Sequence, residues 1–204
     1  MKKSSSNRWL KEHFIDVYVK RAKDEGFRAR SVYKLKDIDE RLKLIKPNYV
    51  VVDLGAAPGG WSQYVVSRLA LNGRVFALDI LPMQPIYKVK FIQGDFTNND
   101  VVQHLINELR GKKVDLVLSD MAPNLSGVKL IDQMRTIELA SQALYFAKQV
   151  LQSKGTFLLK IFQGGEFSIF LKKLYKIFDE VKVLKPEASR ARSSEVFLLS
   201  RNIK

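Results

Sequence analysis

Residues 49–66, with the sequence YVVVDLGAAPGGWSQYVV, constrain the fold of this chain more than any other segment. An apolar, β-branched run leads into a turn with three glycines and one proline, and an amphipathic helix resumes around Trp61. A buried strand that passes through such a turn into a helix brings backbone N–H groups against a nucleotide-like ligand. Gly55, Gly59 and Gly60 do not have the G-x-G-x-x-G spacing of the dinucleotide fingerprint. The turn therefore predicts an adenosine-containing cofactor other than a nicotinamide nucleotide.

Strand-like and helix-like patterns alternate along the rest of the chain. The predicted strands are Tyr49–Leu54, Arg74–Asp79, Val89–Gln93, Val114–Ser119, Gly155–Ile161, Glu180–Leu184 and Glu195–Ser200. The predicted helices are Ala29–Leu44, Gly60–Leu71, Asp100–Arg110, Ile131–Gln152 and Glu166–Ile177. This alternation with short connections predicts an α/β, Rossmann-like fold, in which helices cover both faces of a mostly parallel seven-stranded sheet.

The connection between the last two predicted strands indicates how the sheet ends. Residues 185–194 are too few and too irregular for the crossover helix that joins parallel neighbours. We therefore expect an antiparallel final strand. A sheet that finishes in this way is typical of S-adenosylmethionine (SAM) enzymes rather than of dehydrogenases.

The charge of the chain points to a nucleic-acid partner. The 204 residues carry a formal net charge of +14, which is in the range of nucleic-acid binders. Residues 1–36 hold half of that charge. Aromatic side chains that can stack on RNA bases lie between these charges, at Trp9, Phe14, Tyr18, Phe27 and Tyr33. We expect residues 1–28 to form a basic RNA-contacting segment ahead of one domain, 29–204. A solvated basic face is the alternative, and some of the aromatic side chains must anchor the segment to the core.

Several functional classes are excluded by what the sequence lacks. There is no cysteine, which excludes disulfides, thiolate metal sites and a cysteine nucleophile. The two histidines, His13 and His104, lie far apart without ligand spacing, so no metal site is expected. No apolar run approaches the roughly 20 residues that span a bilayer, and the N-terminus lacks the apolar core of a signal peptide. We therefore expect a cytoplasmic protein without a membrane partner.

Polar residues follow the predicted strands where ligands of open α/β sheets bind, beyond the carboxyl ends. They are the turn 55–61, Asp79, the pair Asp95 and Phe96, and Asp120. An acid about twenty residues after the glycines suits ribose hydroxyls. Asp95 and Phe96 suit the amino group and the face of an adenine. Each acid alone is equally well explained as a helix N-cap, but four polar strand ends in succession predict a nucleoside cofactor.

Two further polar residues occupy positions where an apolar residue is expected. Lys160 ends the predicted strand GTFLLKIF, and Glu195 opens EVFLLS. Lys160 could simply extend from the strand end into solvent, but its expected proximity to Asp120 favours a functional role. A lysine acts as a base at neutral pH only if burial or a second cation lowers its pKa. Lys34 is a candidate for that cation, while Asp120 and Glu195 would oppose the shift and hold the ammonium in place.

Together these motifs resemble the FtsJ/RrmJ-type ribose 2′-O-methyltransferases, which use SAM to modify large-subunit ribosomal RNA. The resemblance covers nearly the whole chain through RSVYKL, VVDLGAAPGGWSQ, ALD, GDF, LSDMAPN, LLKIFQG and KPEASRARSSEVF. It implies a catalytic Lys-Asp-Lys-Glu tetrad at Lys34, Asp120, Lys160 and Glu195. It also implies SAM contacts at Gly59, Trp61, Asp79, Asp95 and Asp120. The glycine turn and the adenine-side strand end add Gly55, Pro58 and Phe96 to the expected cofactor site.

The resemblance implies methyl transfer to a uridine ribose in the A-loop of 23S rRNA, within the 50S ribosomal subunit. In this reaction Lys160 would accept the 2′-OH proton or orient the hydroxyl, and Lys34 would stabilise the developing negative charge. We expect the enzyme to be a monomer. The alternatives are a tRNA or mRNA-cap ribose substrate, or a non-catalytic RNA-binding ribosome-assembly factor. Cytosine-C5 methylation is disfavoured by the lack of cysteine, and amine methylation by the sequence Asp-Met-Ala-Pro at 120–123.

Overall fold

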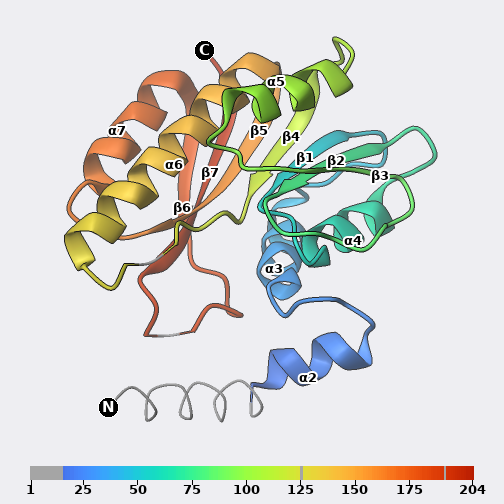
Figure 1. Cartoon of the computed structure of the whole chain (residues 1–204), viewed down its shortest axis with the longest axis horizontal. Helices are drawn as coiled ribbons and strands as arrows, with labels where there is room; N and C mark the ends of the chain where they lie inside the picture. Colours follow the sequence, from blue (N-terminus) through green and yellow to red (C-terminus); the bar gives the residue numbers. More distant parts are fainter. Residues whose placement is uncertain (1–15, 125, 191) are drawn as a thin grey trace.

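The computed structural model describes residues 16–124, 126–190 and 192–204. Seven strands form one sheet in the order β3-β2-β1-β4-β5-β7-β6 (Figure 1). They are β1 (Val50–Leu54), β2 (Arg74–Asp79), β3 (Val89–Gln93), β4 (Val114–Ser119), β5 (Leu151–Phe162), β6 (Phe178–Leu184) and β7 (Glu195–Ile203). Only the pairs β5–β7 and β6–β7 are antiparallel. The predicted sheet with its antiparallel final strand is therefore confirmed.

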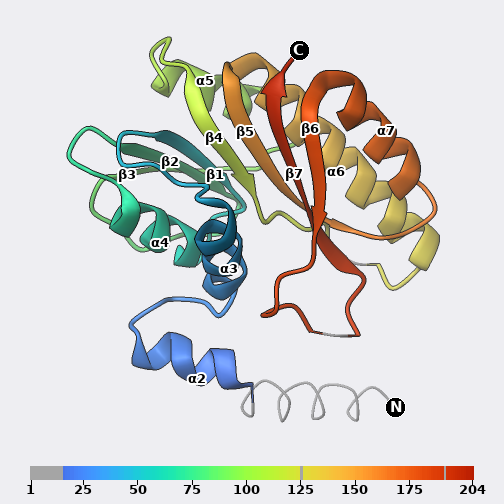
Figure 2. The ribbon, with the colours of Figure 1, turned by 180° about the vertical axis from the view of Figure 1, so that it is seen from behind.

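Helices cover both faces of the sheet (Figures 1 and 2). They are α2 (Val17–Asp24), α3 (Val32–Leu42), α4 (Gly60–Arg68), α5 (Asn99–Glu108), α6 (Lys129–Val150) and α7 (Phe167–Ile177). Successive strand side chains point to opposite faces, so Val51 belongs to the core cluster that contains residues of α3 and α4, whereas Val52 belongs to the cluster that contains residues of α5, α6 and α7. The continuous apolar run at 50–52 is thus explained by burial on both faces.

The structure differs from the predicted elements mainly in length. The helix expected at Ala29–Leu44 spans only Val32–Leu42. Strand β5 begins four residues earlier than expected, at Leu151, which pairs with Val114 across an irregularity in the ladder. Helix α2 was not predicted; it is only eight residues long and strongly charged. It is stabilised locally by Asp16, whose side chain accepts a hydrogen bond from the backbone N–H of Tyr18 at 3.1 Å.

Strand register brings distant residues to one edge of the sheet. Ser119 at the end of β4 pairs with both Leu54 and Leu159. Because β7 is antiparallel, it starts where β5 ends, and Glu195 pairs with Phe162. The carboxyl ends of β1, β4 and β5 therefore meet the beginning of β7. None of the helices in the described part of the chain has the length and apolar character needed to cross a bilayer.

Candidate active site

Two lysine–carboxylate pairs lie at this edge of the sheet. Lys34 Nζ, from α3, lies 2.7 Å from Oε1 and 2.8 Å from Oε2 of Glu195. Lys160 Nζ, at the end of β5, lies 2.8 Å from Oδ1 of Asp120 and donates a hydrogen bond to the Asp120 backbone carbonyl. The contact with Oδ1 is an ion pair without hydrogen-bond alignment. All four predicted tetrad residues are thus paired, with Lys34 on Glu195 and Lys160 on Asp120.

Glu195 is the most buried member of this group and is held in its charged form. Burial alone would raise its pKa, but the positive charges of Lys34 and Lys160 and the hydrogen bonds from Lys34 and Ser189 outweigh burial and lower the pKa. The Ser189 hydroxyl donates to Oε1 at 3.0 Å. Ser189 was not identified from the sequence, although it belongs to the motif KPEASRARSSEVF. Glu195 can therefore keep the Lys34 ammonium fixed at neutral pH.

The glycine turn between β1 and α4 is tied to β2 through Asp79. The Asp79 carboxylate accepts a hydrogen bond from the N–H of Ala57 at 2.9 Å and another from the N–H of Leu81 at 2.8 Å. Pro58 follows a cis peptide bond, and its carbonyl accepts a hydrogen bond from Arg28 at 3.2 Å. Asp79 thus lies directly against the turn, as expected for residues that share a cofactor site.

The positive φ angles of Gly55 and Gly59, +76° and +111°, explain why glycine is required at both positions. A Cβ at Gly55 would also lie 2.8 Å from the backbone nitrogen of Met121, and one at Gly59 would lie 2.8 Å from Ile86. Neighbouring protein atoms therefore occupy the space where these side chains would be. Gly55 allows the segment after β4 to approach the turn closely, and Gly59 allows the same for the segment after β2.

The two predicted aromatic residues of the cofactor site are buried in the core. Trp61 is 2% exposed, packs against Phe197 at a ring distance of 5.9 Å, and donates its indole N–H to the carbonyl of Ser31. Phe96 is 6% exposed and meets the edge of Phe146 at 5.8 Å. Both rings stabilise the helices that flank the site.

Asp95, at the end of β3, is exposed, and its Oδ1 accepts hydrogen bonds from the backbone N–H and the hydroxyl of Thr97, both at 2.8 Å. It shapes a local turn and keeps its carboxylate at the surface. The structure therefore places Asp95 at the same edge of the sheet as Asp79, one strand further out.

Asp53, which sequence reasoning left unassigned, lies fully buried beneath the glycine turn. Its Oδ2 accepts a hydrogen bond from the Ser62 hydroxyl at 2.7 Å, while Oδ1 has no hydrogen-bond partner among the described residues. Burial raises the pKa of Asp53 to about 7, although the bonds from Ser62 oppose the rise. The signal that could have identified this position is an acidic residue inside an otherwise apolar strand.

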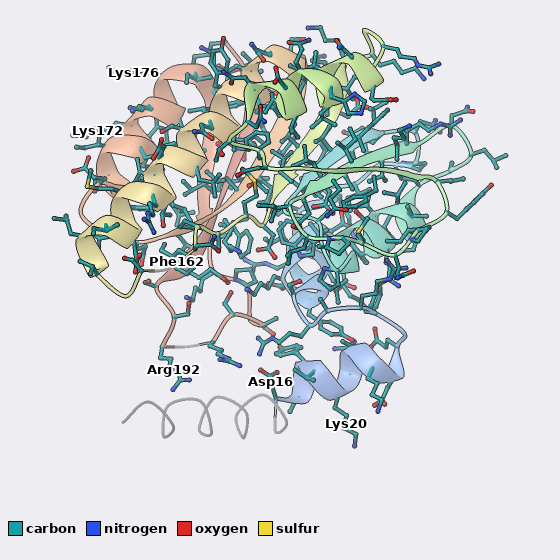
Figure 3. All side chains as sticks on the ribbon, in the orientation of Figure 1. Asp16, Lys20, Phe162, Lys172, Lys176 and Arg192 are labelled. Carbon is teal, nitrogen blue, oxygen red and sulfur yellow. The ribbon has the colours of Figure 1, made fainter. Side chains whose placement is uncertain are left out.

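The described part of the N-terminal segment combines exposed charge with anchoring rings. Tyr18 and Phe27 pack against Tyr33 at ring distances of 5.3 and 6.2 Å. Lys20 points away from the domain on the outer side of α2 (Figure 3). The other predicted RNA-contacting aromatic residues, Trp9 and Phe14, lie outside the described residues, as do the basic residues before position 16 and His13.

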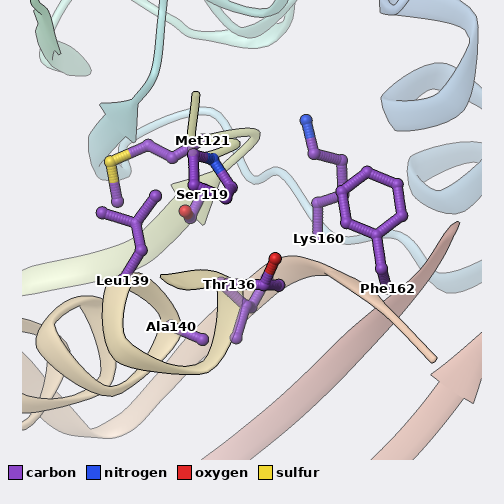
Figure 4. Close-up of a pocket in the computed structure, with 9 residues that line it drawn as sticks. Ser119, Met121, Thr136, Leu139, Ala140, Lys160 and Phe162 are labelled. Carbon is purple, nitrogen blue, oxygen red and sulfur yellow. The ribbon is translucent and has the colours of Figure 1, made fainter. Parts of the chain in front are cut away.

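A small cavity of about 10 Å³, roughly the volume of one water molecule, lies beside Lys160 (Figure 4). Ser119 and Met121 line it from the end of β4, and Thr136 lines it from α6. Lys160 and Phe162 line it from β5, and Figure 4 shows the two side chains beside each other at the strand end. The edge of the sheet therefore leaves some space next to the Lys160 side chain.

Comparison with known proteins agrees with this geometry. The model of the FtsJ-like methyltransferase family matches residues 27–203. The chain is 55% identical to "Ribosomal RNA large subunit methyltransferase E" of Azoarcus sp. strain BH72, over 96% of this chain and 95% of that protein. It is 51% identical to the protein of the same name from Legionella pneumophila strain Corby, over 97% and 96%.

Solved structures show the same fold. A ribosomal RNA methyltransferase from Plasmodium falciparum is 29% identical with a TM-score of 0.77, over 87% of this chain and 98% of that one. Human methyltransferase-like protein 13, at 15% identity and a TM-score of 0.56 over 84% and 78%, shares the fold alone. The family match over residues 27–203 and the high identity confirm the resemblance seen in the motifs, and the chain belongs to the FtsJ-like methyltransferase family.

Proposed function

We propose that this methyltransferase transfers a methyl group from SAM to the ribose 2′-OH of a uridine in the A-loop of 23S rRNA, within the 50S subunit. The observation that carries the proposal is the pair of lysine–carboxylate contacts, Lys34 with Glu195 and Lys160 with Asp120, at one edge of the sheet. The names of the relatives support a large-subunit rRNA substrate. The lack of cysteine excludes the covalent route to cytosine C5.

The residues around the glycine turn fit SAM. When bound, SAM supplies a methyl group on a sulfonium, which is intrinsically transferable, so the protein mainly has to align the acceptor. Each carboxylate oxygen of Asp79 accepts one backbone N–H and retains a lone pair for a ribose hydroxyl. Helix α4 begins at Gly60 beside this carboxylate, and the first N–H groups of a helix lack intrahelical partners. We infer that Gly55, Pro58, Gly59 and the Trp61 backbone hold SAM with Asp79, while Asp95 and Phe96 lie on the adenine side.

The tetrad side chains orient and activate the acceptor hydroxyl. Lys160 is held by Asp120 and is the group that takes or steers the 2′-OH proton. Lys34 is fixed by both oxygens of Glu195, so its positive charge stays in place while negative charge develops on the ribose oxygen. Fixing these groups before the reaction avoids reorganisation at the moment of transfer. The arrangement suits a hydroxyl acceptor.

The test is transfer of a labelled methyl group from SAM to 50S particles that lack the modification. Lys160→Ala should abolish incorporation while RNA affinity is retained. Lys172→Ala is the matched control, because Lys172 is an exposed lysine on α7, away from the site (Figure 3). Undiminished transfer by Lys160→Ala would contradict the mechanism, and transfer to tRNA instead of 50S particles would replace the substrate. We further propose that residues 1–28 contact the RNA and that 29–204 form the methyltransferase domain.

A further inference from the structure

A second, larger cavity opens where α6 and α7 begin. Its volume is about 350 Å³, within the range of small-molecule sites. The lining combines apolar and amide side chains, among them Gln133, Ile137, Phe162, Gln163 and Phe167, with the carboxylates of Asp132 and Glu166. None of these residues belongs to the tetrad or to the expected cofactor site. The cavity therefore needs its own explanation.

The larger cavity adjoins the reaction site. Phe162 and Thr136 line both this cavity and the small cavity that Lys160 also lines. Lys160 and Phe162 are two positions apart on β5, so their side chains leave the strand on the same side. A group that occupies the larger cavity would thus lie directly next to a hydroxyl placed at Lys160.

We propose that this cavity holds the base of the nucleotide whose ribose is methylated, turned out of the RNA stack. The inference rests on the proposed function, since a base is attached to the same ribose that Lys160 would orient. Enzymes that act on a nucleotide within structured RNA commonly expose it in this way and stack its base on aromatic side chains. Phe162 and Phe167 provide such rings.

The amide side chains at the cavity match the edge of a uracil. A carboxamide presents one C=O acceptor and one NH₂ donor side by side, and uracil presents carbonyl acceptors next to a ring N–H. Gln133 belongs to α6 and Gln163 follows β5, and both line the cavity. A site that hydrogen-bonds a substrate group rejects an analogue without that group strongly. We therefore assign Gln133 a role in selecting the base.

Two adjacent glycines offer a variant and its control. A Cβ at Gly164 would lie 2.6 Å from Nε2 of Gln133, so alanine there must displace the amide. A Cβ at Gly165 would lie 3.9 Å from Oε1 of Gln133, which is ordinary contact. Neither glycine has a positive φ, so alanine strains neither backbone. Gly164→Ala thus disturbs the cavity without touching the tetrad.

The experiment measures methyl transfer to 50S particles that carry either uridine or cytidine at the mapped methylation position. Wild type and Gly165→Ala should prefer uridine by about 10-fold or more in kcat/KM. Gly164→Ala should lower kcat/KM on uridine particles about 10-fold and reduce the preference to about 3-fold or less. Gln133→Leu, which cannot hydrogen-bond the base, should reduce the preference in the same way. If the melting temperature of Gly164→Ala lies well below that of Gly165→Ala, Gln133→Leu replaces Gly164→Ala as the test variant.

The outcomes separate the two proposals. If wild type transfers no methyl group to either particle, the proposed function fails. If wild type is active and the preference stays unchanged in both Gly164→Ala and Gln133→Leu, the cavity does not hold the base. A loss of rate with unchanged preference would also overturn the inference, because it would indicate a general disturbance of the strand end.

Discussion

Replacing Asp53 by Asn should remove a pH dependence of stability that the buried carboxyl causes. Burial is the largest influence and raises the pKa of Asp53 from an ordinary 3.8 to about 7, with smaller contributions from the charges of Asp120 and Asp79. One pKa unit corresponds to about 1.4 kcal/mol. The gap between 3.8 and about 7 thus corresponds to roughly 4 kcal/mol at most.

The sign follows from which state holds the proton. Below pH 3.8 the carboxyl is protonated in the folded and the unfolded chain, so no free-energy penalty exists. Between 3.8 and about 7 only the folded protein keeps the proton, so stability falls as the pH rises. Above about 7 both states are charged and the full penalty remains. The free energy of unfolding of Asp53→Asn minus that of wild type should therefore increase with pH by up to roughly 4 kcal/mol.

Urea unfolding followed by circular dichroism at pH values from 4.5 to 8 measures this difference. Titrating groups that do not interact with Asp53, such as Glu195, affect both proteins equally, so subtraction removes their contribution. Ser62→Ala provides a second check: because hydrogen bonds from Ser62 lower the pKa of Asp53, their loss should extend the fall in stability to higher pH. A difference that is flat across this range, or that decreases with pH, would refute the argument from burial.

Three further predictions concern the turn, the cofactor and the RNA. Gly55→Ala should lower the free energy of unfolding in urea denaturation by about 2 kcal/mol more than Gly111→Ala does. Both glycines have a positive φ, but only a Cβ at Gly55 would lie against neighbouring backbone atoms. Equal losses of stability would contradict the close approach. Asp79→Ala should weaken SAM binding at least about 10-fold by calorimetry while RNA affinity stays constant, and unchanged SAM affinity would remove Asp79 from the site. Deleting residues 1–15, which keeps α2 and its contact with Tyr33, should flatten the salt dependence of RNA affinity; an unchanged slope would argue against RNA contact by these residues.

The sheet was predictable because its signals are local. Strands β2, β3 and β4 have the bounds that their apolar runs predicted, since runs of this length bounded by turn residues identify buried strands. Helix α2 could not be predicted in the same way. Its stability depends on tertiary contacts, such as burial of Ala22 in the core that also contains Tyr33.

The site was predictable in composition but not in pairing. The motifs predicted Lys34, Asp120, Lys160 and Glu195, and the order of the strand ends predicted that Lys160 lies near Asp120, as observed. The contact of Lys34 with Glu195 depends on the position of α3 and on the register of β7, which the sequence does not show. The placement of the Trp61 ring in the core could not be predicted from the sequence either. An aromatic residue in a motif has the same local pattern whether its ring faces a ligand or the interior, and packing against Phe197 decides between them.

The position of β7 between β5 and β6 has a consequence for which contacts of the site depend on the whole sheet. The glycine turn and Asp79 are built from β1 and β2, which pair with each other early in the chain. Glu195, by contrast, reaches Lys34 from β7, the last strand along the chain, which pairs with both β5 and β6. Without β7, the facing edges of β5 and β6 would be unpaired. The contact between Lys34 and Glu195 therefore requires the complete sheet, whereas the contact between Asp79 and the glycine turn involves only β1 and β2.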